Sequence, residues 1–108
     1  MIEQIKESDW KVFKELNPLA LDRYCKRVLN EVNGIINEND VGVHDRYLKM
    51  YKVVHERDKR MGEIFDHFSR SKAFIDLVVY YRENLISDEE LSRLSEENQK
   101  RIRAIVEG

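Results

Sequence analysis

Besides its carboxylates, this chain has three histidines and one cysteine that could bind a metal ion. On a single helix, the separation of 11 residues between His44 and His55, and of 12 between His55 and His67, would hold neighbouring rings about 17 Å apart. Ligands of one ion must nearly touch it. We therefore expect no metal and no other cofactor, and we interpret the histidines as surface residues.

Cys25 is the second candidate for chemistry, as a nucleophile. It lies between Leu21 and Val28 on one apolar helical stripe, where a free thiol packs as a small hydrophobe. A lone cysteine cannot form an intrachain disulfide, which favours a reducing, cytoplasmic location. No Gly-rich phosphate loop, supported Ser/His/Asp motif or pair of catalytic carboxylates stands out. The sequence predicts no catalytic residue and a protein that is not an enzyme.

A charged pair, Arg57 and Asp58, interrupts the third apolar stripe of the chain. A charge at the edge of a core is tolerated only when it is paired and hydrogen-bonded, so we expect Asp58 to be partly buried. One hypothesis is a structural ion pair, with Arg23 or Arg82 as the partner. The other is a polar pocket in which Arg57, Asp58, His55 and nearby tyrosines bind a small ligand.

Composition favours one all-α domain that spans residues 1–108. Charged residues make up 37% of the chain and hydrophobic residues 42%, whereas Gly (4) and Pro (1) are scarce, as in amphipathic helices. The 19 Lys and Arg are balanced by 21 Asp and Glu, so no overall positive field attracts nucleic acid. Only a local cluster, Lys100, Arg101 and Arg103, could bind it, and Glu96 and Glu97 would repel phosphates at the same helix.

Apolar spacing predicts the helices that position these residues. Trp10, Phe13 and Leu16 indicate a short helix, capped by Ser8 or Asp9, that covers the core as a lid. Asn17 and Pro18 are typical of a helix start, and the stripe that follows predicts a second helix over residues 18–37. Residues 37–42 are the one clear loop.

A third helix of about 25 residues is predicted from residue 44 onward. If it continued to residue 83 it would be about 60 Å long, whereas a compact domain of this size has a diameter of about 35 Å. We therefore expect a break at residues 69–71 in a monomer. Residues 73–81 are apolar nearly all round and predict a buried fourth helix. Ser87 and Glu90 form a capping-box pattern, and Ser95 can cap a last short helix.

These patterns predict an all-α, single-domain helical bundle with two long helices, a buried apolar fourth helix and short terminal helices. Its longest nearly apolar stretch, residues 73–81, is too short to span a membrane. Core-type residues are abundant while recognisable chemistry is absent, so we expect a non-enzymatic protein-interaction module that forms a homodimer. The alternative is a weak nucleic-acid-binding regulator that uses the C-terminal basic cluster. The candidate dimer interface lies on the fourth helix, at Phe74, Ile75, Val78, Val79 and Tyr81.

Overall fold

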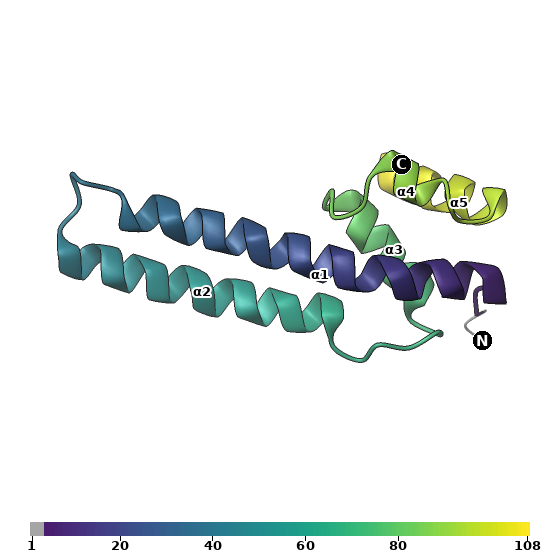
Figure 1. Cartoon of the computed structure of the whole chain (residues 1–108), viewed down its shortest axis with the longest axis horizontal. Coiled ribbons are helices and arrows are strands. Elements are labelled where there is room, and N and C mark those ends of the chain that lie inside the picture. The colour runs from purple at the N-terminus through teal and green to yellow at the C-terminus, as the bar shows by residue number, and fades with distance from the viewer. Residues whose placement is uncertain (1–3) are drawn as a thin grey trace.

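The computed structural model describes residues 4–108, and this part of the chain contains helices and no strand. In chain order the helices are α1 (Glu7–Ile36), α2 (Val43–Phe65), α3 (Ala73–Arg82), α4 (Asp88–Leu91) and α5 (Glu96–Glu107). Figure 1 shows α1 and α2 as a long antiparallel hairpin, with α3, α4 and α5 gathered against the first half of α1. The predicted all-α fold is confirmed. We call residues 4–24 and 64–108 the head, and residues 25–63 the distal hairpin.

The prediction of a separate lid helix before Pro18 is wrong. α1 runs through the proline without a break, although proline removes the N–H that would bond to the carbonyl of Lys14. The side chain of Asn17 does not cap a helix; it donates a hydrogen bond to the Tyr80 hydroxyl at 2.8 Å. Core packing holds the helix together here, because fully buried side chains line up on both sides of the proline: Phe13, Leu16 and Ala20.

Asp9 does not cap α1 either, since that helix begins at Glu7. Its carboxylate is 1% exposed and lies at the start of α5. It accepts hydrogen bonds from the backbone N–H and hydroxyl of Ser95 and from the side-chain amide of Asn98, all at 2.7 Å. A carboxylate from the first helix thus accepts from three donors at the start of the last one, where a negative charge is favoured.

The core of the head is centred on Tyr80 of α3, which is fully buried. Its ring stacks on Phe13 of α1 and Phe65 of α2, with ring centroids 5.9 and 5.5 Å apart. Burial raises the pKa of the Tyr80 phenol to about 12. The aliphatic part of the core combines Leu16 of α1 with residues of the three C-terminal helices and the turns between them, chiefly Leu77, Leu85, Leu91 and Ile102.

The predicted break between the third and fourth helices is confirmed, and it covers residues 66–72. His67 has φ 63°, a left-handed conformation that a right-handed helix cannot continue through. Contacts on both sides fix the connection. The Phe68 ring lies 5.3 Å from that of Trp10, and the Lys72 ammonium donates to the carbonyl of Ile64 at 3.2 Å, near the end of α2.

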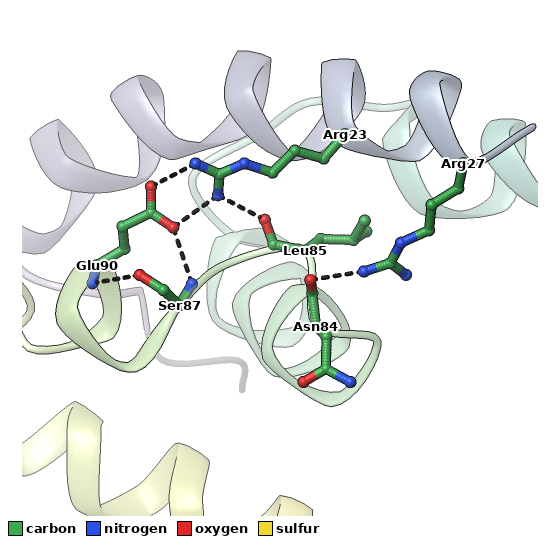
Figure 2. A network of polar contacts seen from close by, with 6 residues as sticks. All are labelled: Arg23, Arg27, Asn84, Leu85, Ser87 and Glu90. Carbon is green, nitrogen blue, oxygen red and sulfur yellow. Dashed lines mark hydrogen bonds and ion pairs between the residues drawn. The ribbon is translucent and has the colours of Figure 1, made fainter. Parts of the chain in front are cut away.

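The turn after α3 is held against α1 by two arginines, as Figure 2 shows. Asn84, at φ 58°, ends α3 in the left-handed conformation that commonly follows a helix. Arg27 donates to the Asn84 carbonyl at 2.6 Å, and Arg23 donates to the Leu85 carbonyl at 2.9 Å. Arg23 also forms a two-pronged ion pair with Glu90, at 2.6 and 2.9 Å.

Both predicted caps in this region are confirmed. The Ser87 hydroxyl accepts from the Glu90 backbone N–H at 3.1 Å, and the Glu90 carboxylate accepts from the Ser87 N–H at 2.8 Å. The Ser95 hydroxyl accepts from the backbone N–H of Asn98 at 3.4 Å. Glu90 therefore caps α4 and binds Arg23 with the same carboxylate.

This double use predicts a pH dependence. The hydrogen bond from Arg23 lowers the Glu90 pKa from 4.5 to about 2, so its stabilising effect is complete above pH 4.5 and is lost as pH falls toward 2. Because Arg23 is 41% exposed, solvent screening reduces the effect, and we expect about 1–2 kcal/mol. Unfolding free energies of the native protein and Glu90→Gln, measured from pH 6 to 2, should differ most above pH 4.5 and converge near pH 2.

The control for this experiment is Glu15→Gln, which removes a carboxylate that pairs with Arg93 on the surface. Glu15 is 63% exposed, so its substitution should change stability by less than about 0.5 kcal/mol at any pH. Parallel curves for the native protein and Glu90→Gln over the whole range would contradict the assignment of this acid sensitivity to Glu90.

The overall shape is elongated, which the assumption of a compact domain did not predict. The molecule measures 52 × 25 × 25 Å and has a radius of gyration of 16.9 Å, compared with about 13 Å for a compact domain near this length. The difference arises because the distal hairpin extends beyond the head (Figure 1). The fold therefore presents a two-helix arm whose sides are not covered by other elements.

Candidate functional site

Of the charged pair singled out in the sequence, Arg57 forms an ion pair between helices and Asp58, within the described residues, does not. Arg57 pairs with Glu31 of α1, its Nε and Nη2 atoms each 3.0 Å from a carboxylate oxygen. Asp58 is exposed, and among residues 4–108 it has no hydrogen-bond or ion-pair partner. The expected burial of Asp58 and its pairing with Arg23 or Arg82 are wrong. Asp58 occupies a position of α2 that the apolar spacing predicted to be buried. This part of α2 belongs to the uncovered arm, so the Asp58 carboxylate is exposed to solvent.

His55 does not converge with Asp58 into a polar pocket. It is exposed, and its ring stacks on that of Tyr51 with centroids 6.2 Å apart. Within the described residues, no three His, Cys, Asp or Glu side chains lie close enough together to hold a metal ion. Cys25 is partly buried, with its sulfur 3.8 Å from that of Met61.

The candidate interface on α3 does not form a continuous exposed face. Val78 is 6% exposed and belongs to the core of the head. Phe74 is covered by Arg101, whose guanidinium lies 4.4 Å from the ring centre, and the Tyr81 hydroxyl donates to Asp88 at 2.6 Å. Val79 is partly buried against the core, and only Ile75 is clearly exposed, at 56%. α5 covers much of the surface that we expected a second chain to cover.

The C-terminal basic cluster is partly engaged within the chain. Arg101 lies over the Phe74 ring, and Arg103 donates to the Asp88 carboxylate at 3.1 Å. A hollow of about 1090 Å³ is lined by Arg23, Asp88 and Glu90, among others, and the charges of these three are already paired. We find no feature there that favours a ligand.

A different surface stands out, on one side of the α1–α2 hairpin. Seven apolar residues lie along this side, and six of them keep between 42% and 76% of their accessible surface. We call them the hairpin face: Leu29, Val32, Ile36, Val43, Tyr47, Tyr51 and Val54. Their spacings of three and four residues place each set on one side of its helix. A pocket shared by Leu29 and Val54 shows that the two sets adjoin.

The pocket on the hairpin face has a volume of about 210 Å³. Its walls come from both helices and are almost entirely apolar, with Cys25, Val28 and Met61 among the residues that line it. Arg57 and Asp58 also line it, although almost none of its accessible surface is polar. The pocket therefore has an apolar interior, and Asp58 beside it has no partner among the described residues.

Ion pairs hold the hairpin together and link it to the end of α3. In addition to Arg57 with Glu31, Lys49 pairs with Glu38 at 2.9 Å. Arg60 links α2 to the end of α3 through Glu83, also at 2.9 Å. The hairpin thus has helices joined by ion pairs and one apolar side that no described element covers.

Neither a family model, nor a curated protein, nor a solved structure matches this chain. Of the helices that the structure describes, none combines the length and the apolar character needed to cross a membrane. The hairpin face is the strongest functional feature of the described surface.

The hairpin face was present in the sequence as a signal that we assigned to the core. Tyr47, Tyr51 and Val54 have the helical spacing of a buried stripe, and we interpreted them as such. Spacing shows which side of a helix is apolar but not what covers that side. The remaining helices are too short to cover the full length of α1 and α2, and this difference in length is the signal that could have indicated an exposed face.

Proposed function

We propose that this protein is a non-enzymatic protein-interaction module that acts as a homodimer, and that the two copies meet through the hairpin face. The observation that carries the proposal is the exposure of this apolar surface on a projecting arm. Six of its seven residues keep between 42% and 76% of their accessible surface, and contiguous exposed apolar residues of this kind mark interaction sites.

A second copy is the occupant that best fits this surface. A standard stable interface buries about 800 Å² on each partner, and a two-fold axis allows one patch to cover its own duplicate. Two hairpins packed face to face form a four-helix bundle, the usual way to bury one apolar side of each hairpin. Exposed tyrosines supply the aromatic area that is enriched at interfaces.

The experiment that tests this proposal combines mass with site-specific crosslinking. The purified protein should sediment at twice the chain mass at micromolar concentration. A photoreactive phenylalanine analogue at position 51 should crosslink two copies, whereas the same analogue at position 75, an exposed apolar site on α3, should not. A native mass of one chain, with no crosslink from position 51, would disprove the proposal.

A further inference from the structure

We infer that the pocket on the hairpin face receives Tyr47 of the partner subunit, in a dimer whose two hairpins run antiparallel. The phenol ring fills the apolar pocket and its hydroxyl donates a hydrogen bond to Asp58. This inference rests on the proposed function, and it names the orientation of the dimer and the residues that fix it.

Spacing along α2 carries the orientation. After Val43, which begins the helix, four residues on its uncovered side follow at steps of four, three and four: Tyr47, Tyr51, Val54 and Asp58. The steps read the same from either end of the set. A two-fold axis between positions 52 and 53 therefore brings these four positions of one α2 opposite the same four positions of an antiparallel α2 in the second copy. It pairs position 51 with 54, and position 47 with 58.

The apolar residues of α1 are centred on the same two-fold axis. The contacts from Arg57 to Glu31 and from Cys25 to Met61 show which positions of the two helices are level. They place the centre of the α2 set opposite position 34 of α1. The apolar residues Leu29 to Ile36 are centred within about 2 Å of that level. One axis therefore serves both helices.

The chemistry of the pocket fits the same arrangement. A volume of about 210 Å³ is sufficient for one aromatic ring, since a cavity of about 150 Å³ in another protein binds benzene. The antiparallel axis carries Tyr47 of the partner subunit to the level of Asp58, which lines this pocket. A carboxylate that dimerisation removes from water needs a donor, and a phenol hydroxyl supplies one next to an apolar ring.

The head leaves room for this arrangement. The arginines that hold the head, Arg23 and Arg27, point about 120–160° around α1 from Leu29. The head therefore lies away from the hairpin face. In the antiparallel dimer the two heads are at opposite ends, whereas in a parallel dimer they would lie side by side.

Disulfide trapping tests the orientation. In a Cys25→Ser background, Tyr47→Cys and Asp58→Cys proteins should form no disulfide dimer alone, because like positions are about 16 Å apart in the proposed dimer. Mixed and oxidised, they should crosslink to each other. A dimer that crosslinks only through like positions would overturn the antiparallel register but leave the proposed function intact. A native mass of one chain would overturn both.

A second measurement tests the hydrogen bond without new thiols. Tyr47→Phe should weaken dimerisation at least about 100-fold, because it removes one charge-assisted hydrogen bond from each half of the dimer. The Tyr47→Phe, Asp58→Ala double variant should be no weaker than the weaker single variant. Asp45→Ala, an exposed carboxylate on another side of α2, is the control and should change nothing. Additive effects of Tyr47→Phe and Asp58→Ala would overturn the contact.

Discussion

Replacing Asp9 with alanine should lower the free energy of unfolding by about 3 kcal/mol. The substitution removes the acceptor of three hydrogen bonds, from the Ser95 N–H and hydroxyl and the Asn98 amide. Each buried donor left without a partner costs about 1–3 kcal/mol, although the freed hydroxyl can turn to another acceptor. The loss should be measured by chemical denaturation at one protein concentration, because dimerisation also contributes to stability.

Two further variants make the test specific to this carboxylate. Asp9→Asn keeps one acceptor oxygen but points an amide N–H₂ toward donors. Its free energy of unfolding should therefore lie between those of the native protein and Asp9→Ala. Glu7→Ala removes a carboxylate from the same first turn, which pairs with Arg70 on the surface and is 60% exposed. This loss should stay below about 0.5 kcal/mol. Equal losses for Glu7→Ala and Asp9→Ala would show that the contact with α5 is not important for stability.

Tyr51→Lys should convert the dimer to a folded monomer. Tyr51 is 63% exposed within one chain, and lysine is a good helix former, so the monomer loses little stability. In the proposed dimer the same change puts an unpaired charge near the centre of the interface. A buried unpaired charge costs about 3–5 kcal/mol, and each dimer would contain two of them, so the dissociation constant should rise at least 1000-fold. Sedimentation should show the mass change, and circular dichroism should show unchanged helix content.

The matched control is Ile75→Lys, an exposed apolar residue on α3 at 56%. It belongs to the interface that the sequence predicted, so the two variants separate the two surfaces. If Ile75→Lys abolishes the dimer and Tyr51→Lys does not, the copies meet through α3, and the proposal for the hairpin face is wrong.

Features that depend on neighbours in the chain were predictable. The break after α2 followed from the length of a continuous helix, and the structure places it at residues 66–72. The caps at Ser87 and Ser95 followed from side-chain types at fixed offsets. These signals are local, because a serine hydroxyl reaches only the N–H groups two or three positions ahead.

Features that depend on distant residues were not predictable in the same way. Pro18 was interpreted as a helix start, but packing against α3 outweighs the hydrogen bond that the proline removes. Asp9 was interpreted as a cap for its own helix, whereas its partners lie 86 and 89 residues away. The donors that a carboxylate meets depend on how the helices pack, which local propensity does not specify.

The same limit explains the candidate site. The sequence correctly identified Arg57 and Asp58 as polar residues in an apolar stripe, but it could not show that this part of the stripe lies beyond the head. The same apolar spacing therefore gives buried residues near the head and exposed residues on the arm. Near the head, Ile64 is buried in the core, whereas ten residues earlier Val54 is 42% exposed.

The sparse interior of the distal hairpin has a consequence for its dynamics. Between residues 29 and 54, all of which the structure describes, Ile35 is the only buried side chain. Backbone amides protected mainly by local helix bonds open at a lower free energy than those of a packed core, so the arm and the head form two cooperative units of different local stability. Association through the arm would raise the protection of the weaker unit, and the affinity between copies would include the cost of ordering it.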